Sequence, residues 1–248
     1  MILVEACVNS VASAIEAVKG GAHRVELCDN LFEGGTTPSA ATILMTAQKI
    51  GVDLHVLIRP RGGDFLYSEL EMEVMKRDIQ YCKRHGVKGV VLGVLEPNGQ
   101  VDIKLTHELV KEAFPMSVTF HRAFDMVADP FQALEEVIST GCHRILTSGL
   151  SNKAWDGREM IANLVRTAKG RIIIMAGSGI NYENAKQLVR FTGVTEIHTS
   201  SRTSYPSKMK YQSKNVFMGG IPQIPEYETL LTDAEKIKMI VQSLNGEL

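Results

Sequence analysis

The chain has 248 residues, of which 44% are hydrophobic and 22% are charged, a composition typical of a globular domain. Its 27 basic and 28 acidic side chains nearly balance, which excludes the basic excess of a nucleic-acid groove or a polybasic membrane anchor. No apolar run approaches the ~20 residues of a membrane span, and the N-terminus lacks the pattern of a signal peptide. We therefore expect a cytoplasmic protein that binds neither nucleic acid nor membrane, with free thiols rather than a disulfide framework.

A strand-like apolar run followed by a helix-like segment recurs eight times along the chain. The runs begin near residues 2, 23, 53, 88, 117, 143, 171 and 195. Helices are expected at 11–19, 40–48, 69–84 and 131–139 among others, where Asn, Ser or Asp residues can accept from the first free N–H groups. Eight such units predict an α/β fold, a single-domain (β/α)8 TIM-type barrel over residues 1–248. A doubly wound open sheet has the same local pattern, and the length favours the barrel.

One region interrupts this alternation. About thirty residues, at 200–231, separate the eighth strand from a last helix that is expected to begin near Thr232, whereas most connections are a few residues long. The sequence predicts a long loop here. Its aromatic residues favour an ordered lid or a subunit contact over disorder: Tyr205, Tyr211, Phe217 and Tyr227.

The first two predicted strands both end in Glu-x-Cys, at residues 5–7 and 26–28. Side chains alternate along a strand, so Cys7 and Cys28 could face each other across the ~5 Å that separates neighbouring strands. Two thiols at that distance suit a soft ion such as Cu(I), whereas Zn(II) would need two further ligands. The alternative is that both cysteines are small buried hydrophobic residues, and Cys82 and Cys142 are interpreted as packing or surface residues.

The third predicted strand runs into a charged turn at residues 58–65. Pro60 ends the strand, and the two glycines that follow allow the backbone to approach another group closely. Arg59, Arg61 and Asp64 could bind an anionic ligand there. They could equally form an Arg–Asp pair that only holds the turn together.

The fifth predicted strand ends with His121, Arg122 and Asp125 in close succession. His121 could act as a base, an acid or a ligand, or it could be a structural histidine held by Asp125. Together with Glu26 from the second strand, it is a candidate general base. Because the carboxyl ends of barrel strands meet at one mouth, these groups are expected to converge there.

Small and hydroxyl-bearing residues follow the last two predicted strands. In many barrels the loops after strands seven and eight bind a phosphate through glycine N–H groups, so we expect an anion site formed by Gly177, Ser178, Gly179 and Ser200. With the arginines of the charged turn and of strand five, this set would suit an enzyme that acts on a small phosphorylated or carboxylated metabolite. The sequence leaves open whether the chain catalyses any reaction.

Several of these segments together resemble the CutC copper homeostasis proteins. The resemblance covers almost the whole chain and rests on residues 4–7, 24–28, 33–39, 58–65, 118–126, 144–149 and 196–198. It implies a cytoplasmic, homodimeric TIM-type barrel linked to copper tolerance, with Cys7 and Cys28 as Cu(I) ligands. The first functional hypothesis is therefore Cu(I) binding in copper homeostasis, with no organic cofactor, and the metabolite enzyme is the alternative.

Overall fold

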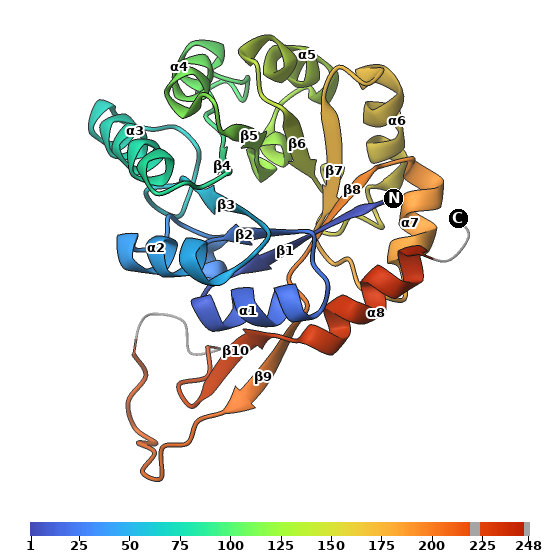
Figure 1. Ribbon diagram of the computed structural model, residues 1–248. Coiled ribbons are helices and arrows are strands. Elements are labelled where there is room, and N and C mark those ends of the chain that lie inside the picture. Colours follow the sequence, from blue (N-terminus) through green and yellow to red (C-terminus); the bar gives the residue numbers. More distant parts are fainter. Residues whose placement is uncertain (219–223, 246–248) are drawn as a thin grey trace.

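A closed barrel of eight parallel strands forms the centre of the protein (Figure 1). The computed structural model describes residues 1–218 and 224–245. The barrel strands follow one another in sequence order, and the last pairs with the first: β1 (Leu3–Val8), β2 (Arg24–Leu27), β3 (Asp53–Leu57), β4 (Gly89–Leu92), β5 (Ser117–Phe120), β6 (Arg144–Thr147), β7 (Ile173–Gly177) and β8 (Glu196–Thr199). The predicted single-domain barrel is thereby confirmed, and the open sheet is excluded.

Helices surround the barrel and alternate with its strands. They are α1 (Val11–Lys19), α2 (Ala40–Lys49), α3 (Glu69–Arg84), α4 (Ile103–Ala113), α5 (Pro130–Thr140), α6 (Arg158–Ala168), α7 (Ala185–Thr192) and α8 (Ala234–Asn245), with short 3-10 turns η1 (Leu31–Glu33) and η2 (Arg122–Met126). Several begin at a side chain that accepts from the first turn; at α3 the Ser68 cap and Glu71 form a capping box. The four helices placed by residue number in the sequence analysis all form, within a residue or two of the expected limits.

The two faces of the barrel strands carry different residues. Val4 and Ala6 of β1 belong to the same hydrophobic cluster as Ala14 and Ala17 of α1, so this face of the strand packs against the helical layer. Glu5, which lies between them, points into the barrel and meets polar partners from other strands. The interior of this barrel is therefore charged in the layer beneath its mouth.

Two glycines make room for large side chains inside the barrel. A Cβ atom at Gly89 of β4 would lie 2.4 Å from Nε2 of His55, and one at Gly177 of β7 would lie 2.6 Å from Cδ1 of Leu146. Contacts this short do not occur between packed atoms, so these positions accept only glycine while the neighbouring side chains keep their places.

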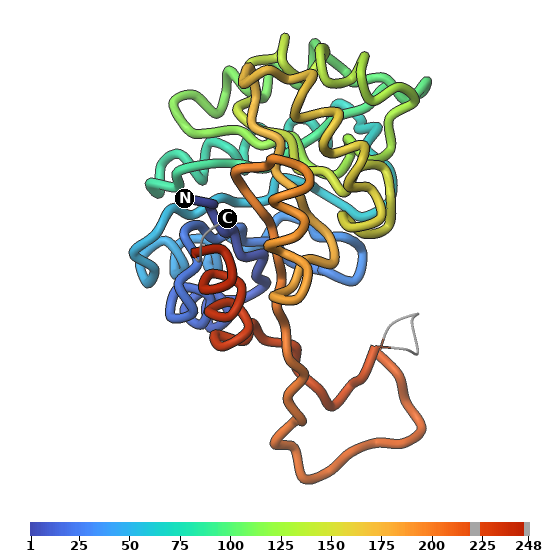
Figure 2. The backbone as a smooth tube through the Cα atoms, turned by 90° about the vertical axis from the view of Figure 1, so that its right-hand side faces the viewer, coloured from blue at the N-terminus to red at the C-terminus, as the bar shows by residue number. Residues whose placement is uncertain are grey.

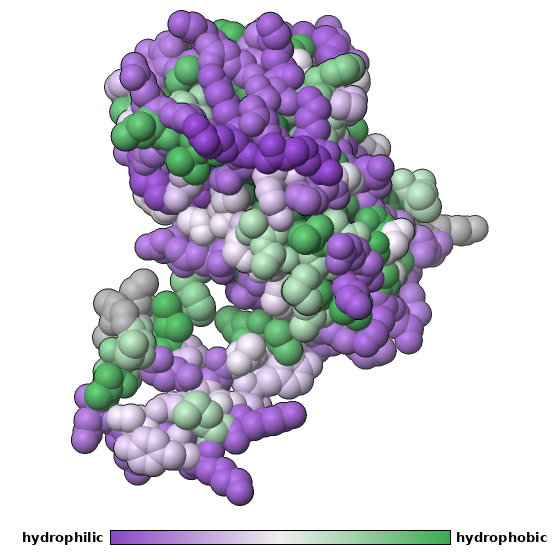
Figure 3. Space-filling model, turned by 60° about the vertical axis from the view of Figure 1, so that its left-hand side comes forward, coloured by the Kyte–Doolittle hydropathy of each residue, from purple (hydrophilic) through white to green (hydrophobic). Residues whose placement is uncertain are grey.

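A hairpin arm extends away from the barrel between β8 and α8 (Figure 2). The ends of the segment at 200–231, where a long loop was expected, pair as the antiparallel strands β9 (Arg202–Pro206) and β10 (Glu228–Thr232). Of the four aromatic residues noted there, Tyr205, Tyr211 and Phe217 are exposed, and the Tyr227 hydroxyl accepts from the Ser213 N–H group at 2.6 Å. Figure 3 shows apolar side chains interspersed with polar ones on this arm.

None of the described helices has the length and apolar character needed to cross a membrane.

Candidate functional site

Four charged side chains form a network inside the barrel. Arg24 of β2 donates to Glu5 of β1 and, at 2.5 Å, to Glu196 of β8. Arg144 of β6 reaches the same Glu196 oxygen at 3.1 Å. All four residues are buried. Because buried charges are tolerated only with partners, this alternation of two carboxylates and two guanidiniums explains how the barrel can hold them.

Glu5 is the centre of this network. Burial by itself would raise the pKa of its carboxyl group, but the nearby Arg24 charge and the hydrogen bond from His198 outweigh burial and lower the pKa below its usual range. Glu5 is therefore a carboxylate that accepts from His198 Nδ1 at 2.8 Å. Its other oxygen lies 3.9 Å from Nδ1 of His55, whose pKa burial lowers to about 3.

His198 connects the charged network to the cavity above it. Since Nδ1 is bound to Glu5, the Nε2 atom faces the second carboxylate, Glu26, at 3.7 Å. Burial alone would lower the pKa of His198, but the Glu26 charge and the contacts with Cys7 and Glu5 raise it well above its ordinary value. Burial raises the pKa of Glu26, with a contribution in the same direction from the Glu5 charge, whereas His198 acts in the opposite direction.

The two cysteines of the Glu-x-Cys segments lie side by side. In the β1–β2 register Cys7 stands opposite Glu26, and Cys28 follows one residue after the end of β2. Even so, the two Sγ atoms are 3.4 Å apart, and Cys28 Sγ also lies 3.4 Å from the Val8 carbonyl oxygen, to which it donates. The Cys28 contact, followed by burial, raises the pKa of the Cys7 thiol well above its ordinary value.

Cys7 also has oxygen and nitrogen neighbours suited to a metal. One donor atom each from Cys7, Glu26 and His198 lies within 4.8 Å of the other two. Sulfur, imidazole nitrogen and carboxylate oxygen together form a donor set that borderline and soft metal ions accept. Cys82 and Cys142 lie elsewhere in the core, where burial raises the pKa of each thiol to about 12.

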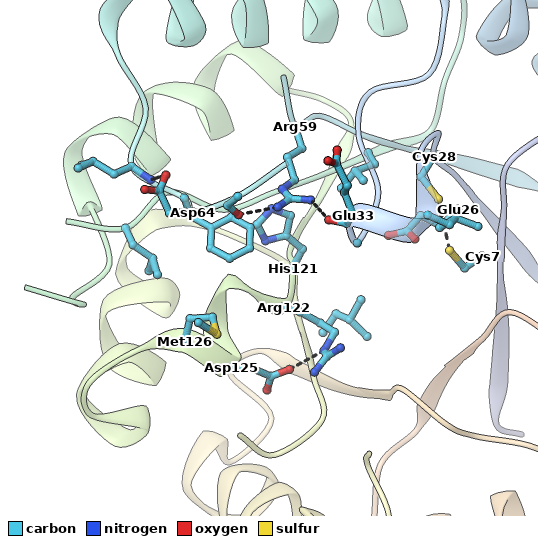
Figure 4. Close-up of a pocket in the computed structure, with 18 of the residues that line it drawn as sticks. Cys7, Glu26, Cys28, Glu33, Arg59, Asp64, His121, Arg122, Asp125 and Met126 are labelled. Atoms are coloured by element: carbon cyan, nitrogen blue, oxygen red, sulfur yellow. Dashed lines mark hydrogen bonds and ion pairs between the residues drawn. The ribbon is translucent and has the colours of Figure 1, made fainter. Parts of the chain in front are cut away.

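A cavity of about 820 Å³ opens above the thiols (Figure 4). Eight of the residues singled out in the sequence line it: Cys7, Glu26, Cys28, Arg59, Asp64, His121, Arg122 and Asp125. His198 lines it too. No described residue of the arm does, so in this structure the arm is not a lid over the cavity.

The arginines of the charged turn have different roles. Arg61 is not part of the cavity lining; it pairs with Glu71 at 2.6 Å and with the lining residue Asp64 at 3.0 Å. The expected Arg–Asp pair therefore exists, and it involves Arg61. Arg59 is buried and donates to three backbone carbonyl groups, those of Glu33, Gly35 and Gly63, at 2.7–2.8 Å.

His121 and Asp125 do not form the pair that was considered for them. Asp125 accepts from Arg122 at 2.7 Å and from the Ser148 N–H group and hydroxyl. His121 Nδ1 instead accepts from the Ala123 N–H group at 3.2 Å, at the start of η2. Burial, and then the Arg59 charge, lower the pKa of His121 to about 3, so the ring is neutral at ordinary pH.

The expected phosphate-binding turn is separate from the cavity. Gly177, Ser178, Gly179 and Ser200 are absent from its described lining. Ser178 Oγ donates to the Asn152 carbonyl at 2.7 Å, and the Gly179 carbonyl accepts from Asn184 at 2.9 Å. These groups hold neighbouring loops together, so the structure does not unite them with the arginines in one anion site.

His198 and Glu196, both on β8, were not among the site residues expected from the sequence. The signal was present, because Glu196 and His198 alternate with Ile197 and Thr199 and therefore share the inward face of β8. Only barrel closure, which pairs Glu5 with His198 in the β1–β8 register, shows that this face meets the Glu-x-Cys segments.

Comparison with known proteins identifies relatives of this chain. A model of the CutC family matches residues 2–203. A family protein CutC of Parabacteroides distasonis is 49% identical over 241 residues, 96% of this chain and 99% of that protein. A copper homeostasis protein cutC homolog of Mus musculus is 46% identical over 96% of this chain and 88% of its own length. The crystal structure of a CutC protein from Streptococcus agalactiae superposes with a TM-score of 0.77 at 36% identity, over 81% of this chain and 99% of that one.

Proposed function

The chain belongs to the CutC family, and we propose that it serves copper homeostasis by binding Cu(I) between Cys7 and Cys28. The observation that carries the proposal is the 3.4 Å separation of the two Sγ atoms. Metal–sulfur bonds are ~2.3 Å long for Zn(II), so two sulfurs on one ion of similar size lie at most ~4.6 Å apart. The thiols are already within that limit, and thiolates are the ligands that Cu(I) prefers.

The surroundings of the thiols suit a bound cation. Both cysteines line the cavity, which gives an ion a route to them from the mouth. Thiols must lose their protons to bind a metal. One Cu(I) ion compensates one of the two thiolate charges, and the protonated His198 beside Cys7 opposes the other. Glu26 and His198 stand next to Cys7 and could add a third donor, and Glu26, whose pKa burial raises, is the group that could take up a proton.

A competition titration tests this proposal. Reduced protein is titrated with Cu(I) without oxygen, against a chromophoric Cu(I) chelator, alongside the Cys7→Ser, Cys28→Ser and Cys142→Ser variants. Cys142 is the matched control, because it is also buried but lies away from the cavity. We expect one ion per chain in the wild type and in Cys142→Ser, with the competing affinity reduced at least tenfold in the other two. Wild-type affinity in both Cys7→Ser and Cys28→Ser would refute the site.

The resemblance also carries a proposal about assembly. We expect a homodimer, as the resemblance to the family implies, and the arm with its exposed aromatic residues is the element to test. Light scattering of the wild type and of a Tyr211→Ser, Phe217→Ser variant measures the mass of the particle directly. An unchanged dimer in the variant would assign the contact to another surface, and a monomeric wild type would contradict the dimer.

A further inference from the structure

The cavity above the thiols is much larger than a metal ion requires. Its volume of about 820 Å³ lies within the 300–1,000 Å³ typical of small-molecule sites. Much of its wall is apolar. The apolar part includes the side chains of Leu31, Leu57, Phe65, Leu95, Met126 and Leu146. An ion held by Cys7 and Cys28 would occupy only its floor. The remaining space has the size and the lining of a site for an organic molecule.

One wall of this cavity carries a buried positive charge. Arg59 is only 5% exposed, and within the described residues no carboxylate lies within 4.0 Å of its guanidinium group. The three carbonyl oxygens that it contacts satisfy N–H groups without neutralising the charge, and its Nε atom has no partner among the described atoms. The other cations of the lining have carboxylates beside them, Asp125 for Arg122 and Glu5 for His198. Buried charge without an opposite charge is unfavourable, so an anionic ligand fits this wall.

A neutral hydrogen-bond donor stands next to this charge. His121 Nδ1 accepts from Ala123, which places the ring proton on Nε2, and Nε2 has no partner in the part of the chain that the structure describes. The residue is 5% exposed and lines the cavity. The centroid of the Phe65 ring lies 4.9 Å from that of the imidazole and 5.0 Å from Arg59 Cζ, so the three groups adjoin one another. Figure 4 shows Arg59 and His121 close together. An unpaired buried donor favours a ligand that accepts a hydrogen bond. Because Nε2 has less than 1 Å² of accessible surface, a ligand reaches it after a small shift of the side chains around it.

We propose that this cavity binds a small organic monocarboxylate, with its carboxylate toward Arg59 and His121 and its apolar body against the leucine and phenylalanine side chains. The proposal is independent of copper binding. A singly charged head is favoured over a phosphate, because Glu33 and Glu96 add negative charge at the mouth, whereas the charge of Asp64 is paired with Arg61. Glu33 and Glu96 are exposed and screened by solvent, so they oppose a second negative charge without cancelling the attraction of the buried guanidinium.

The test measures binding of simple probes to reduced, copper-free protein by calorimetry and by thermal unfolding. The probes are benzoate, 4-methylpentanoate, the neutral analogue benzamide and inorganic phosphate. Two charge variants at the mouth locate the site, Met126→Asp and Glu96→Gln, since both residues line the cavity at exposed positions. Met209→Asp is the control, because Met209 is exposed on the arm, outside the cavity lining.

We expect the carboxylates to bind and to raise the unfolding temperature, and benzamide and phosphate to bind at least tenfold more weakly. Met126→Asp should weaken carboxylate binding about fivefold and Glu96→Gln should strengthen it, with Met209→Asp unchanged, as expected for single exposed charges near the ligand. A Cys7→Ser, Cys28→Ser variant should keep carboxylate binding, which separates this site from the copper site. Equal binding of benzoate and benzamide, preference for phosphate, or no binding of either carboxylate would overturn the proposal.

Discussion

The buried His121 should make the protein sensitive to mild acid. Its folded-state pKa of about 3 lies below the ordinary value of 6.5, because burial and Arg59 disfavour the imidazolium. Between these two values the unfolded chain binds a proton that the folded protein does not bind. The stability of the folded state therefore rises with pH in this window, and it falls as the pH is lowered from 6.5 toward 3.

The size of this effect at pH 5 depends mainly on the unfolded chain. At 1.5 pH units below the ordinary pKa of 6.5, protonation of the unfolded histidine lowers the free energy of unfolding by about 2 kcal/mol, at 1.36 kcal/mol per unit. At pH 7 the same term is only a few tenths of a kcal/mol. The result holds as long as the folded-state pKa stays below ~4, so it does not depend on the depth of the shift.

Replacement of His121 by phenylalanine isolates this term. The substitution His121→Phe keeps a ring beside Phe65 but leaves the Ala123 N–H group without its acceptor, a loss of ~1 kcal/mol at every pH. Urea unfolding at pH 5, 6 and 7 should show that the wild type loses about 2 kcal/mol more than the variant between pH 7 and pH 5. Leu92→Ala is the control, because Leu92 is buried but does not titrate. This variant should lower the free energy of unfolding by the same amount at pH 5, 6 and 7. If His121→Phe loses as much stability as the wild type over this range, the histidine is not held neutral and the reasoning is wrong.

Two further substitutions probe the barrel interior. Arg24→Met should lower the free energy of unfolding by roughly 3–5 kcal/mol, because it leaves two buried carboxylates without their shared guanidinium; a loss below 1 kcal/mol in denaturant unfolding would show that the network is not tightly buried. Gly89→Ala should cost roughly 1–3 kcal/mol, since the new methyl group would meet the His55 ring at 2.4 Å. Differential scanning calorimetry measures the second loss, and an unfolding temperature equal to that of the wild type would mean that the ring has space to move.

The sequence predicted the barrel well because its signal is repeated eight times. Each strand is marked by an apolar run and most helices by a capping residue, so single errors of a residue or two do not change the topology. The Cys7–Cys28 pairing was predicted on the same basis, from two equal segments at the ends of adjacent strands. Its details were not, because the sequence does not give the stagger between strands, which places Cys7 opposite Glu26 rather than opposite Cys28.

The anion site was harder to predict because it depends on the direction of individual side chains. Arg59 and Arg61 are two residues apart, yet one lines the cavity and the other pairs outside it with Glu71. The turn at Gly177–Gly179 follows a neighbouring strand end but directs its polar groups to adjacent loops. Loop conformation decides both cases, and composition alone does not encode it.

The buried charges beneath the cavity are better explained by the orientation that they give to the His198 ring than by a contribution to the stability of the fold. A buried ion pair contributes little net free energy compared with a well-packed apolar pair. Here, however, Arg24 fixes the Glu5 carboxylate, and Glu5 in turn accepts from His198 Nδ1, which leaves Nε2 directed toward Glu26 and the Cys7 thiol. Apolar residues in the same positions could fill the volume but could not set the direction of this ring. Arg24 does not line the cavity, yet its loss should change the environment of the thiols through two intervening side chains.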